Sequence, residues 1–242
     1  MKIKFIFSIL FIASVAFSAS GQSVVITGKK VTYKRPKPFA DYKKEFTITY
    51  PKVKAATPAL SKKIESSISY ASVLHLDLQG ELMDFQWLED ADYQVGYNKN
   101  GVLSIELSME GSGAYLSVDS KTAVVDLRSG VRVRPANVFT NLNGLAAMVR
   151  KAQKDEIAES IKEIKKDPEY EEPNPERLFK DANFKTVNLD EFSVNGDGVT
   201  FHYNYGFPHA IQALGPSGNF TFTWSQLKPY IKRGGLLTRI AR

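Results

Sequence analysis

The sequence predicts an α+β protein, in which an antiparallel sheet of hairpins and a meander packs with two main helices and a short C-terminal helix. Segments of alternating polar and apolar residues recur between turn residues, which is typical of half-buried strands. Two longer segments instead carry apolar residues at spacings of three and four, as amphipathic helices do. The 242 residues, 43% of them hydrophobic, suffice for a sizeable core.

The chain begins with two expected strands and a helix. Residues 24–33 alternate and are rich in β-branched side chains, and residues 44–50 alternate until a proline stops them. Thr57 followed by Pro58 indicates a helix start, because a hydroxyl caps the helix and proline suits its first position. We expect this helix to run to about residue 74. Its apolar stripe consists of Leu60, Ile64, Ile68 and Ala71.

The middle of the chain is interpreted as an antiparallel meander that follows a polar stretch at residues 79–84. The turn Asn98-Lys99-Asn100-Gly101 separates two alternating segments, which predicts a hairpin. A polar turn and Arg128-Ser129-Gly130 then separate three further strands. The expected strands are residues 93–97, 102–109, 115–119, 122–126 and 131–134.

A long helix, capped by Asn141 or Asn143, is expected to end at Lys165-Lys166-Asp167-Pro168, before a surface loop at residues 167–177. Its apolar residues are Leu145, Met148, Val149, Ala152, Ile157, Ile161 and Ile164. Three strands follow, at residues 187–194, 199–205 and 220–224. Ser225 is expected to cap a short helix that ends at Gly234-Gly235.

The first residues have the pattern of a secretion signal. Lys2 and Lys4 precede an apolar run at residues 6–17, and Ala19-Ser20-Gly21 supplies the small residues of a cleavage site. We expect cleavage after Gly21, with Ser18 and Ser20 as alternatives. A buried first helix or a membrane anchor is the rival interpretation, but the run is shorter than the ~20 residues that a spanning helix requires. The mature protein is therefore expected to be periplasmic or extracellular, with no stable membrane span.

Composition narrows the chemistry further. The chain has no cysteine, which excludes disulfides, thiolate nucleophiles, cysteine zinc sites and a lipoprotein anchor. The formal charge of +6 falls by two when Lys2 and Lys4 are removed. The remaining basic residues are scattered, apart from Lys29-Lys30, Lys34-Arg35 and the tail around Lys232-Arg233, Arg239 and Arg242. Nucleic acid is therefore not an expected partner. A plain solvated basic surface and a weak attraction to anionic glycans or lipids both remain open.

No catalytic residue, metal ligand set or cofactor is predicted. The histidines are His75, His202 and His209, no two of which are spaced to share a metal on one helix. An acidic cluster lies beside two aromatic residues and consists of Glu89, Asp90 and Asp92, with Trp87 and Tyr93. Paired carboxylates serve glycosidases, but neighbours in sequence rarely flank a bond from two sides, so a solvated turn before a strand is favoured. Ser112 and Ser217 lie outside any nucleophile-elbow pattern.

The second half of the chain resembles a known family. The hairpin strand with "LSI", the segment "DLRSG" before "VF" and the long helix come first, followed by "FHYNYGFPHAIQALGPSGNFTFTWSQLKPYI". Over about residues 46–232 the chain resembles the domain shared by RsiV-type anti-sigma factors and the region before the catalytic domain of PdaC-type peptidoglycan deacetylases. It departs from that family at Tyr115, where a histidine is usual. The resemblance implies an α+β fold that binds partners, lysozyme in one class, and performs no chemistry itself.

The resulting expectation is an exported, non-catalytic envelope domain that binds a cell-wall glycan or a wall-acting protein such as a lysozyme-like enzyme. An enzyme acting on peptidoglycan or another polysaccharide is the alternative, and a structural envelope component is a third. The expected organisation is a signal peptide (1–21), a strand and linker (22–43), the domain (44–233) and a basic tail (234–242).

Recognition is assigned to the loop at residues 207–218, because two prolines restrict it and a simple connector has no need of its apolar residues. The expected ligand-binding residues are Phe207, His209, Ile211 and Leu214. In the rival interpretation, the apolar side chains fold back and cap an aromatic strand face made of Phe201, Tyr203, Tyr205 and Phe207.

Overall fold

The computed structural model describes residues 22–113, 115–166 and 174–241, apart from the side chains of His209 and Ala210. The described strands are β1 (Val25–Lys34), β2 (Glu45–Lys54), β3 (Leu88–Lys99), β4 (Val102–Ser112), β5 (Leu116–Asp126), β6 (Val131–Arg132), β7 (Phe192–Val194), β8 (Gly198–His202) and β9 (Asn219–Thr223). The α-helices are α1 (Pro58–Ser67), α2 (Tyr70–Val73), α3 (Leu78–Met83), α4 (Pro135–Val138), α5 (Leu142–Lys166) and α6 (Trp224–Leu227). Four 3-10 helices complete the set: η1 (Pro175–Phe179), η2 (Thr186–Asp190), η3 (His209–Leu214) and η4 (Leu236–Arg239).

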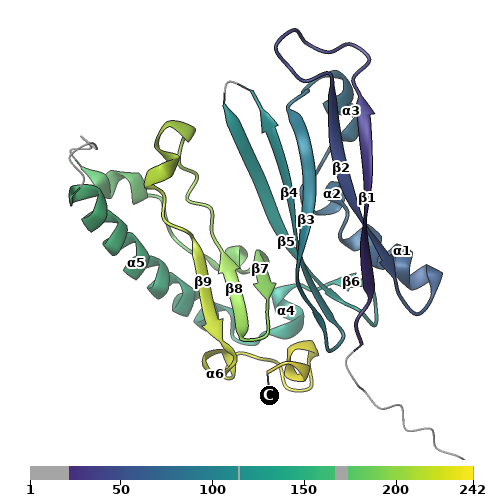
Figure 1. Cartoon of the computed structure of the whole chain (residues 1–242). Helices are drawn as coiled ribbons and strands as arrows, with labels where there is room; N and C mark the ends of the chain where they lie inside the picture. The colour runs from purple at the N-terminus through teal and green to yellow at the C-terminus, as the bar shows by residue number, and fades with distance from the viewer. Residues whose placement is uncertain (1–21, 114, 167–173, 242) are drawn as a thin grey trace, which may run out of the picture.

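These elements confirm the α+β fold class and arrange it around two sheets (Figure 1). The larger sheet has the strand order β1-β2-β3-β4-β5-β6 and is antiparallel except where β2 and β3 pair in parallel over two residues. The smaller sheet has the order β7-β8-β9. The two sheets meet where β7 approaches β4 and β5, and they diverge towards the end of the molecule that carries η3 (Figure 1).

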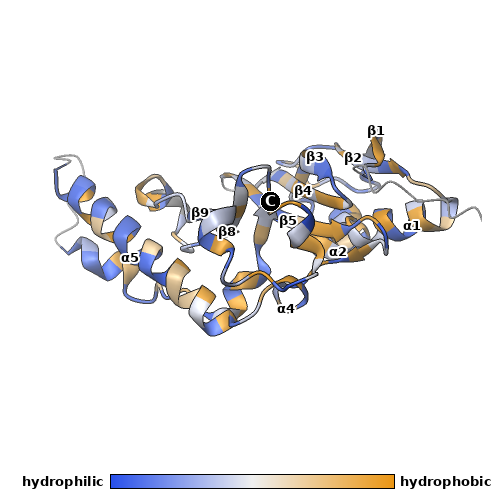
Figure 2. Ribbon diagram, turned by 90° about the horizontal axis from the view of Figure 1, so that it is seen from below, coloured by the Kyte–Doolittle hydropathy of each residue, from blue (hydrophilic) through white to orange (hydrophobic). Residues whose placement is uncertain are grey.

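Two hydrophobic cores correspond to the two sheets. The first lies between the larger sheet and α1 to α3, and the fully buried Ile64 and Ile68 belong to it. The second joins α5 and α4 to the apolar face of the smaller sheet, around Phe184 and Phe201. Hydrophobic and hydrophilic residues alternate along α5, as its sequence pattern predicts (Figure 2).

The first half of the chain follows the predicted pattern with several corrections. Thr57 caps α1 and Pro58 occupies its first turn, as expected. The helix, however, ends at Ser67 and a new one begins under a Ser69 cap, so Ala71 is exposed instead of continuing the buried stripe. The polar stretch at residues 79–84 is mostly helix, because the Asp77 side chain caps α3.

β2 also continues through Pro51, where the sequence predicts its end. The carbonyl of Thr49 accepts a hydrogen bond from Tyr70, and the N–H of Val53 donates to Glu65, so both backbone groups point away from β1. Alternation places the nitrogen of Pro51 on the same side. Its missing N–H therefore costs no hydrogen bond to β1.

The predicted hairpin of β3 and β4 is confirmed. Asn100 and Gly101 have φ angles of 54° and 77°, the left-handed conformation that a tight hairpin turn needs. The two strands expected at residues 115–119 and 122–126 form one continuous strand, β5. Its polar middle residues remain in the strand because β4 pairs with it without a register shift.

In the second half, Asn141 caps α5 by accepting a hydrogen bond from Gly144, and the helix ends at Lys166. Most of the loop predicted at residues 167–177 lies outside the described residues. The expected strand at residues 187–194 begins with the 3-10 helix η2, and the following strand ends at His202. Thr223, not Ser225, caps α6, where it forms a capping box with Gln226.

The expected N-terminal strand and the expected basic tail both contact the rest of the chain. β1 pairs with β2 over ten residue pairs. Arg35 lies among the basic residues of the sequence, yet its side chain is 0% exposed. It donates to the carbonyls of Lys43 and Leu88, both at 2.6 Å. At the other end, the expected basic tail forms η4 and buries Leu237 completely. The predicted signal peptide (1–21) lies outside the described residues.

Candidate functional site

The loop at residues 207–218 is anchored at both ends by one carboxylate of α5. The hydroxyl of Tyr205, just before the loop, donates to Glu156 Oε2 at 2.8 Å. At the other end, Ser217 Oγ and Gly218 N donate to Glu156 Oε1 at 2.8 and 3.2 Å. Burial raises the pKa of Tyr205 well above its ordinary value, and the Glu156 carboxylate raises it further, so this hydroxyl remains a donor. Gly218 has a φ of 65°, and a Cβ there would collide with the Tyr203 carbonyl.

Aromatic rings pack the segment that leads into the loop. Alternate residues keep to one side after β8 ends, so the rings of Tyr203, Tyr205 and Phe207 form a series. The Phe207 ring lies 5.3 Å from Phe179 and 6.2 Å from Tyr205, between ring centroids. Phe207 therefore packs against the domain, as the rival interpretation of the loop expects.

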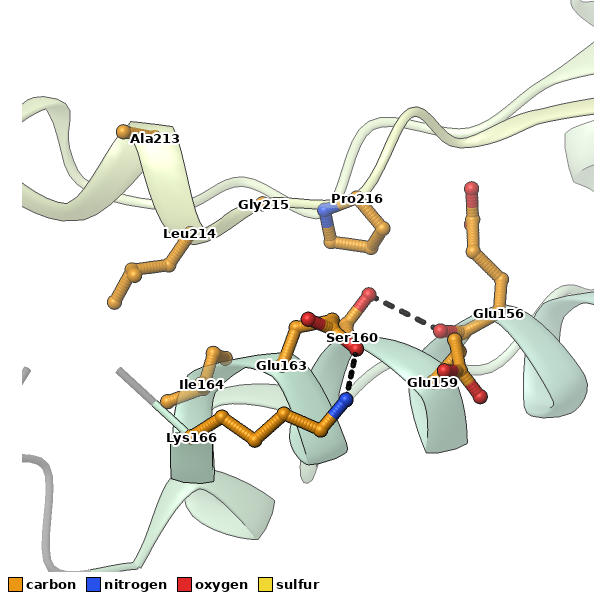
Figure 3. A pocket seen from close by; sticks show the side chains of 10 residues that line it. All are labelled: Glu156, Glu159, Ser160, Glu163, Ile164, Lys166, Ala213, Leu214, Gly215 and Pro216. Atoms are coloured by element: carbon orange, nitrogen blue, oxygen red, sulfur yellow. Dashed lines mark hydrogen bonds and ion pairs between the residues drawn. The ribbon is translucent and has the colours of Figure 1, made fainter. Parts of the chain in front are cut away.

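A groove of about 730 Å³ separates the loop from α5, and we call it the α5 groove (Figure 3). At one end Leu214 of the loop faces Ile164 of the helix, and at the other Pro216 lies near Glu156 (Figure 3). Glu163 borders the groove and is neutralised by an ion pair with Lys166 at 2.7 Å. The groove is thus apolar at one end and acidic at the other.

A second cavity of about 600 Å³ lies on the other side of the loop, and we call it the β5 cleft. One wall consists of residues 118–122 of β5, and the other comprises the aromatic segment and the loop residues Gly215 and Pro216, which also border the α5 groove. Polar side chains predominate, among them Glu106, Asp119, Lys121, Glu191, Gln212 and Asn219. The loop therefore presents two different cavities on its two sides.

The structure distributes the predicted ligand-binding residues over these cavities. Phe207 lines the β5 cleft, Leu214 lines the α5 groove, and the half-buried Ile211 lines neither. The side chain of His209 lies outside the described part of the structure. Sequence reasoning missed Glu156, because nothing in the helical pattern distinguishes it from the other glutamates of α5.

Two other titratable candidates, His202 and Glu89, have structural partners. His202 Nδ1 donates a hydrogen bond to Asn219 Oδ1 at 2.7 Å, and His202 Nε2 shares one with Ser193 Oγ at 2.9 Å, which ties β8 to its two neighbours. Glu89 lies in β3, not in the turn that the sequence predicts, and forms an ion pair with Lys43. Burial would raise the pKa of Glu89, but hydrogen bonds from Lys43 and Ser112 outweigh it and lower the pKa.

Two absences hold for the described ranges. Among these residues, no group of three or more histidine, aspartate or glutamate side chains is placed to hold a metal ion. Nor is any helix in residues 22–113, 115–166 or 174–241 both long and apolar enough to cross a membrane.

Comparison with known proteins identifies the fold. A DUF3298 family member from Bacteroides fragilis is 14% identical, with a TM-score of 0.52 over 89% of this chain and 97% of that one. A DUF3298 family protein from Pseudomonas aeruginosa is 12% identical, with a TM-score of 0.50 over 86% and 94%. No family model and no curated protein matches the sequence. The chain therefore has a DUF3298-like fold.

Proposed function

We propose that this protein is an exported, non-catalytic binding domain of the cell envelope, which recognises a wall-acting protein or a wall glycan through the loop at residues 207–218. The anchoring of the loop by Glu156 is the observation that carries the proposal. A carboxylate that holds both ends lowers the entropy lost when a partner binds. The loop also borders a cavity on each side, so a partner can contact it from two directions.

The fold supports the same assignment. DUF3298 is the family of RsiV-like and PdaC-like domains, which is the family that the sequence resembles. In that resemblance the domain binds partners, and the catalytic domain of the deacetylase class is a separate unit. The signal-like residues 1–21 support export of the mature chain to the periplasm or the cell exterior.

A protein partner fits the geometry better than a glycan. Glycan sites commonly use exposed aromatic faces, whereas the rings here pack against one another and are half-buried. The Tyr205 hydroxyl is engaged by Glu156, and the Tyr203 hydroxyl accepts a hydrogen bond from Asn183 N at 3.2 Å. These tyrosines therefore offer little to a sugar, whereas Leu214 and the α5 groove offer an apolar contact with an acidic rim.

The test compares binding with catalysis on the same protein. The mature chain is incubated with purified peptidoglycan and, separately, with purified lysozyme. Sedimentation or interferometry measures binding, and chromatography measures soluble fragments or acetate. We expect binding without product, and we expect Leu214→Ser to weaken it. Product release would establish the enzyme alternative, and binding that is indifferent to Leu214 would remove the loop from the site.

Export is tested independently by the intact mass of the secreted protein. The carbonyl of Gln22 accepts a hydrogen bond from Gly101 N at 2.8 Å, and cleavage after Gly21 would preserve this contact. We therefore expect a mature N-terminus at or just before Gln22. A full-length product retained in the membrane would contradict both the cleavage and the assigned compartment.

A further inference from the structure

One edge of the larger sheet is open beside the β5 cleft. β5 pairs with β4 along its whole length, whereas β6 pairs only with Val125 and Asp126. Towards β6 the open stretch ends at Thr122, whose outward N–H donates a hydrogen bond to Glu191 Oε1 at 2.6 Å. In the described part of the chain, no strand pairs with the outer side of residues 116–121.

Alternation determines which backbone groups face this edge. The Thr122 N–H and the Val124 carbonyl both point away from β4, the latter towards Val133 N at 2.7 Å. The register between β4 and β5 has no shift, so the N–H and carbonyl of Val118 and Ser120 point the same way. Among the described residues, neither Val118 nor Ser120 has a hydrogen-bond partner on that side. These groups border the cleft, where an added chain can reach them.

The edge lacks the usual protection against strand addition. Proteins commonly block an open edge with lysine or proline. β1, at the opposite edge, carries Lys29, Lys30 and Lys34. Residues 116–120 of β5 contain neither lysine nor proline, and Val118 is 59% exposed. The one lysine of the uncovered stretch is the half-buried Lys121 at its end, next to Thr122. An extended chain can therefore approach Val118 and Ser120 without meeting a proline or a series of lysines.

The charge of the sheet face beside this edge indicates which side chains a bound segment would carry. In cross-strand register, Asp90 of β3 lies opposite Glu110 of β4, which lies opposite Val118 of β5. The next rows on the same sheet face add Asp92 and Glu106, and all four acidic residues are exposed. The sheet face beside the open edge is thus acidic, although the chain as a whole is basic. A strand with basic residues at alternate positions would complement it.

We propose that the open edge of β5 binds an extended, basic peptide segment of a partner protein, which adds to the sheet as a strand in line with β6. Main-chain hydrogen bonds to Val118 and Ser120 supply affinity, and the acidic face selects the side chains. The inference rests on the proposed function, because it takes the partner to be a protein. A second copy of this chain fits less well, since its own β5 lies in a cleft of about 600 Å³ between its sheet and its loop.

The experiment titrates the mature protein with a blocked seven-residue peptide of alternating threonine and lysine, followed by backbone NMR. In a second peptide the backbone nitrogens of the threonines are methylated, and in a third those of the lysines. Each change removes the N–H groups along one edge of the extended peptide and keeps its charge. We expect the parent to bind and to slow amide exchange at Val118 and Ser120. The peptide methylated on the edge that faces β5 should bind at least about tenfold more weakly than the parent peptide. The peptide methylated on the other edge should bind as the parent does.

Two matched variants locate the site. Ser120→Pro removes an outward N–H without loss of a hydrogen bond to β4, so the fold should be retained while peptide affinity falls about tenfold. Thr32→Pro makes the same kind of change at the outward side of β1 and should leave affinity unchanged. Replacement of Glu106 and Glu110 by glutamine should weaken binding several-fold at low salt.

Several results would overturn the inference. They are no peptide binding at millimolar concentration, equal binding of both methylated forms, and a concentration-dependent dimer that Ser120→Pro abolishes, which would assign the edge to a second copy. The proposed function is judged separately. If lysozyme binding requires Leu214 while the peptide does not bind β5, the loop assignment stands and the strand addition fails.

Discussion

Glu156 and Tyr205 come from elements 49 residues apart in sequence, yet a 2.8 Å hydrogen bond joins them beneath the loop. The same carboxylate reaches the far end of the loop through Ser217. One residue of α5 thus sets the spacing between the two ends of the candidate recognition loop.

We expect Glu156→Ala to lower the free energy of unfolding by about 2 kcal/mol, because charge-assisted hydrogen bonds are lost and the half-buried Tyr205 hydroxyl loses its acceptor. Partner binding should weaken as well, since the loop becomes less ordered. Thermal unfolding and amide exchange across residues 207–218 measure both effects. The control, Asp155→Ala, breaks only an exposed ion pair of α5 with Lys151, away from the α5 groove, and should change little. Unchanged exchange in the loop would contradict the anchoring role.

Single substitutions of Phe207 and Leu214 should have different effects on stability and on partner binding. Phe207→Ser removes a ring that packs on Phe179 and Tyr205, and should cost about 2 kcal/mol of stability. Leu214→Ser changes a half-buried residue at the α5 groove and should lower partner binding more than the melting temperature. Calorimetry and a binding assay on both variants check this. Equal melting temperatures for the two variants would contradict the packing of Phe207.

Ile64→Asp should destabilise the protein by about 4 kcal/mol or more, because it places an unpaired charge where the side chain is completely buried. Lys62→Asp, on the exposed side of the same helix, is the control and should shift stability by less than about 1 kcal/mol. Chemical denaturation measures both variants. Similar losses of unfolding free energy for the two variants would mean that Ile64 does not lie on the buried face of α1.

Acidification should lower the free energy of unfolding, in part because Glu89 becomes protonated. Its pKa in the folded state is lowered by Lys43 and Ser112 despite burial, so its stabilisation is present above the ordinary glutamate pKa and is lost as the pH falls through the folded value. Glu89→Gln should therefore be less stable than the wild type at pH 7, by a margin that shrinks towards pH 3. Glu110→Gln, which alters an exposed carboxylate of β4, is the comparison. A margin independent of pH would refute the linkage.

Local chemistry made much of the fold predictable. The Thr57-Pro58 helix start and the Asn100-Gly101 turn depend on neighbours in sequence, so the sequence is sufficient to identify them. The continuity of β5 depends instead on its pairing with β4, which no local pattern reveals. Arg35 is basic and precedes Pro36, so the sequence predicts an exposed side chain. The guanidinium is instead buried, because it donates hydrogen bonds to the carbonyls of Lys43 and Leu88.

The candidate site was less predictable for the same reason. The loop was identified from its composition, but its anchor lies in α5 and its second cavity is walled by β5. Glu156 acts through contacts with residues more than 45 positions away. Only the three-dimensional arrangement distinguishes it from its exposed neighbour Glu159.

The two ends of the described chain converge on one pole of the molecule. Gln22 bonds to the β3–β4 turn through Gly101, and Arg239 approaches Asp126 of β5 at 3.8 Å. The candidate recognition loop lies at the opposite pole (Figure 1). A surface, a tag or a fusion partner attached at either terminus would therefore hold the molecule by its base and present the loop outward. Immobilisation through a terminal tag should leave both cavities accessible, whereas random coupling through lysines would block β5 in part of the population.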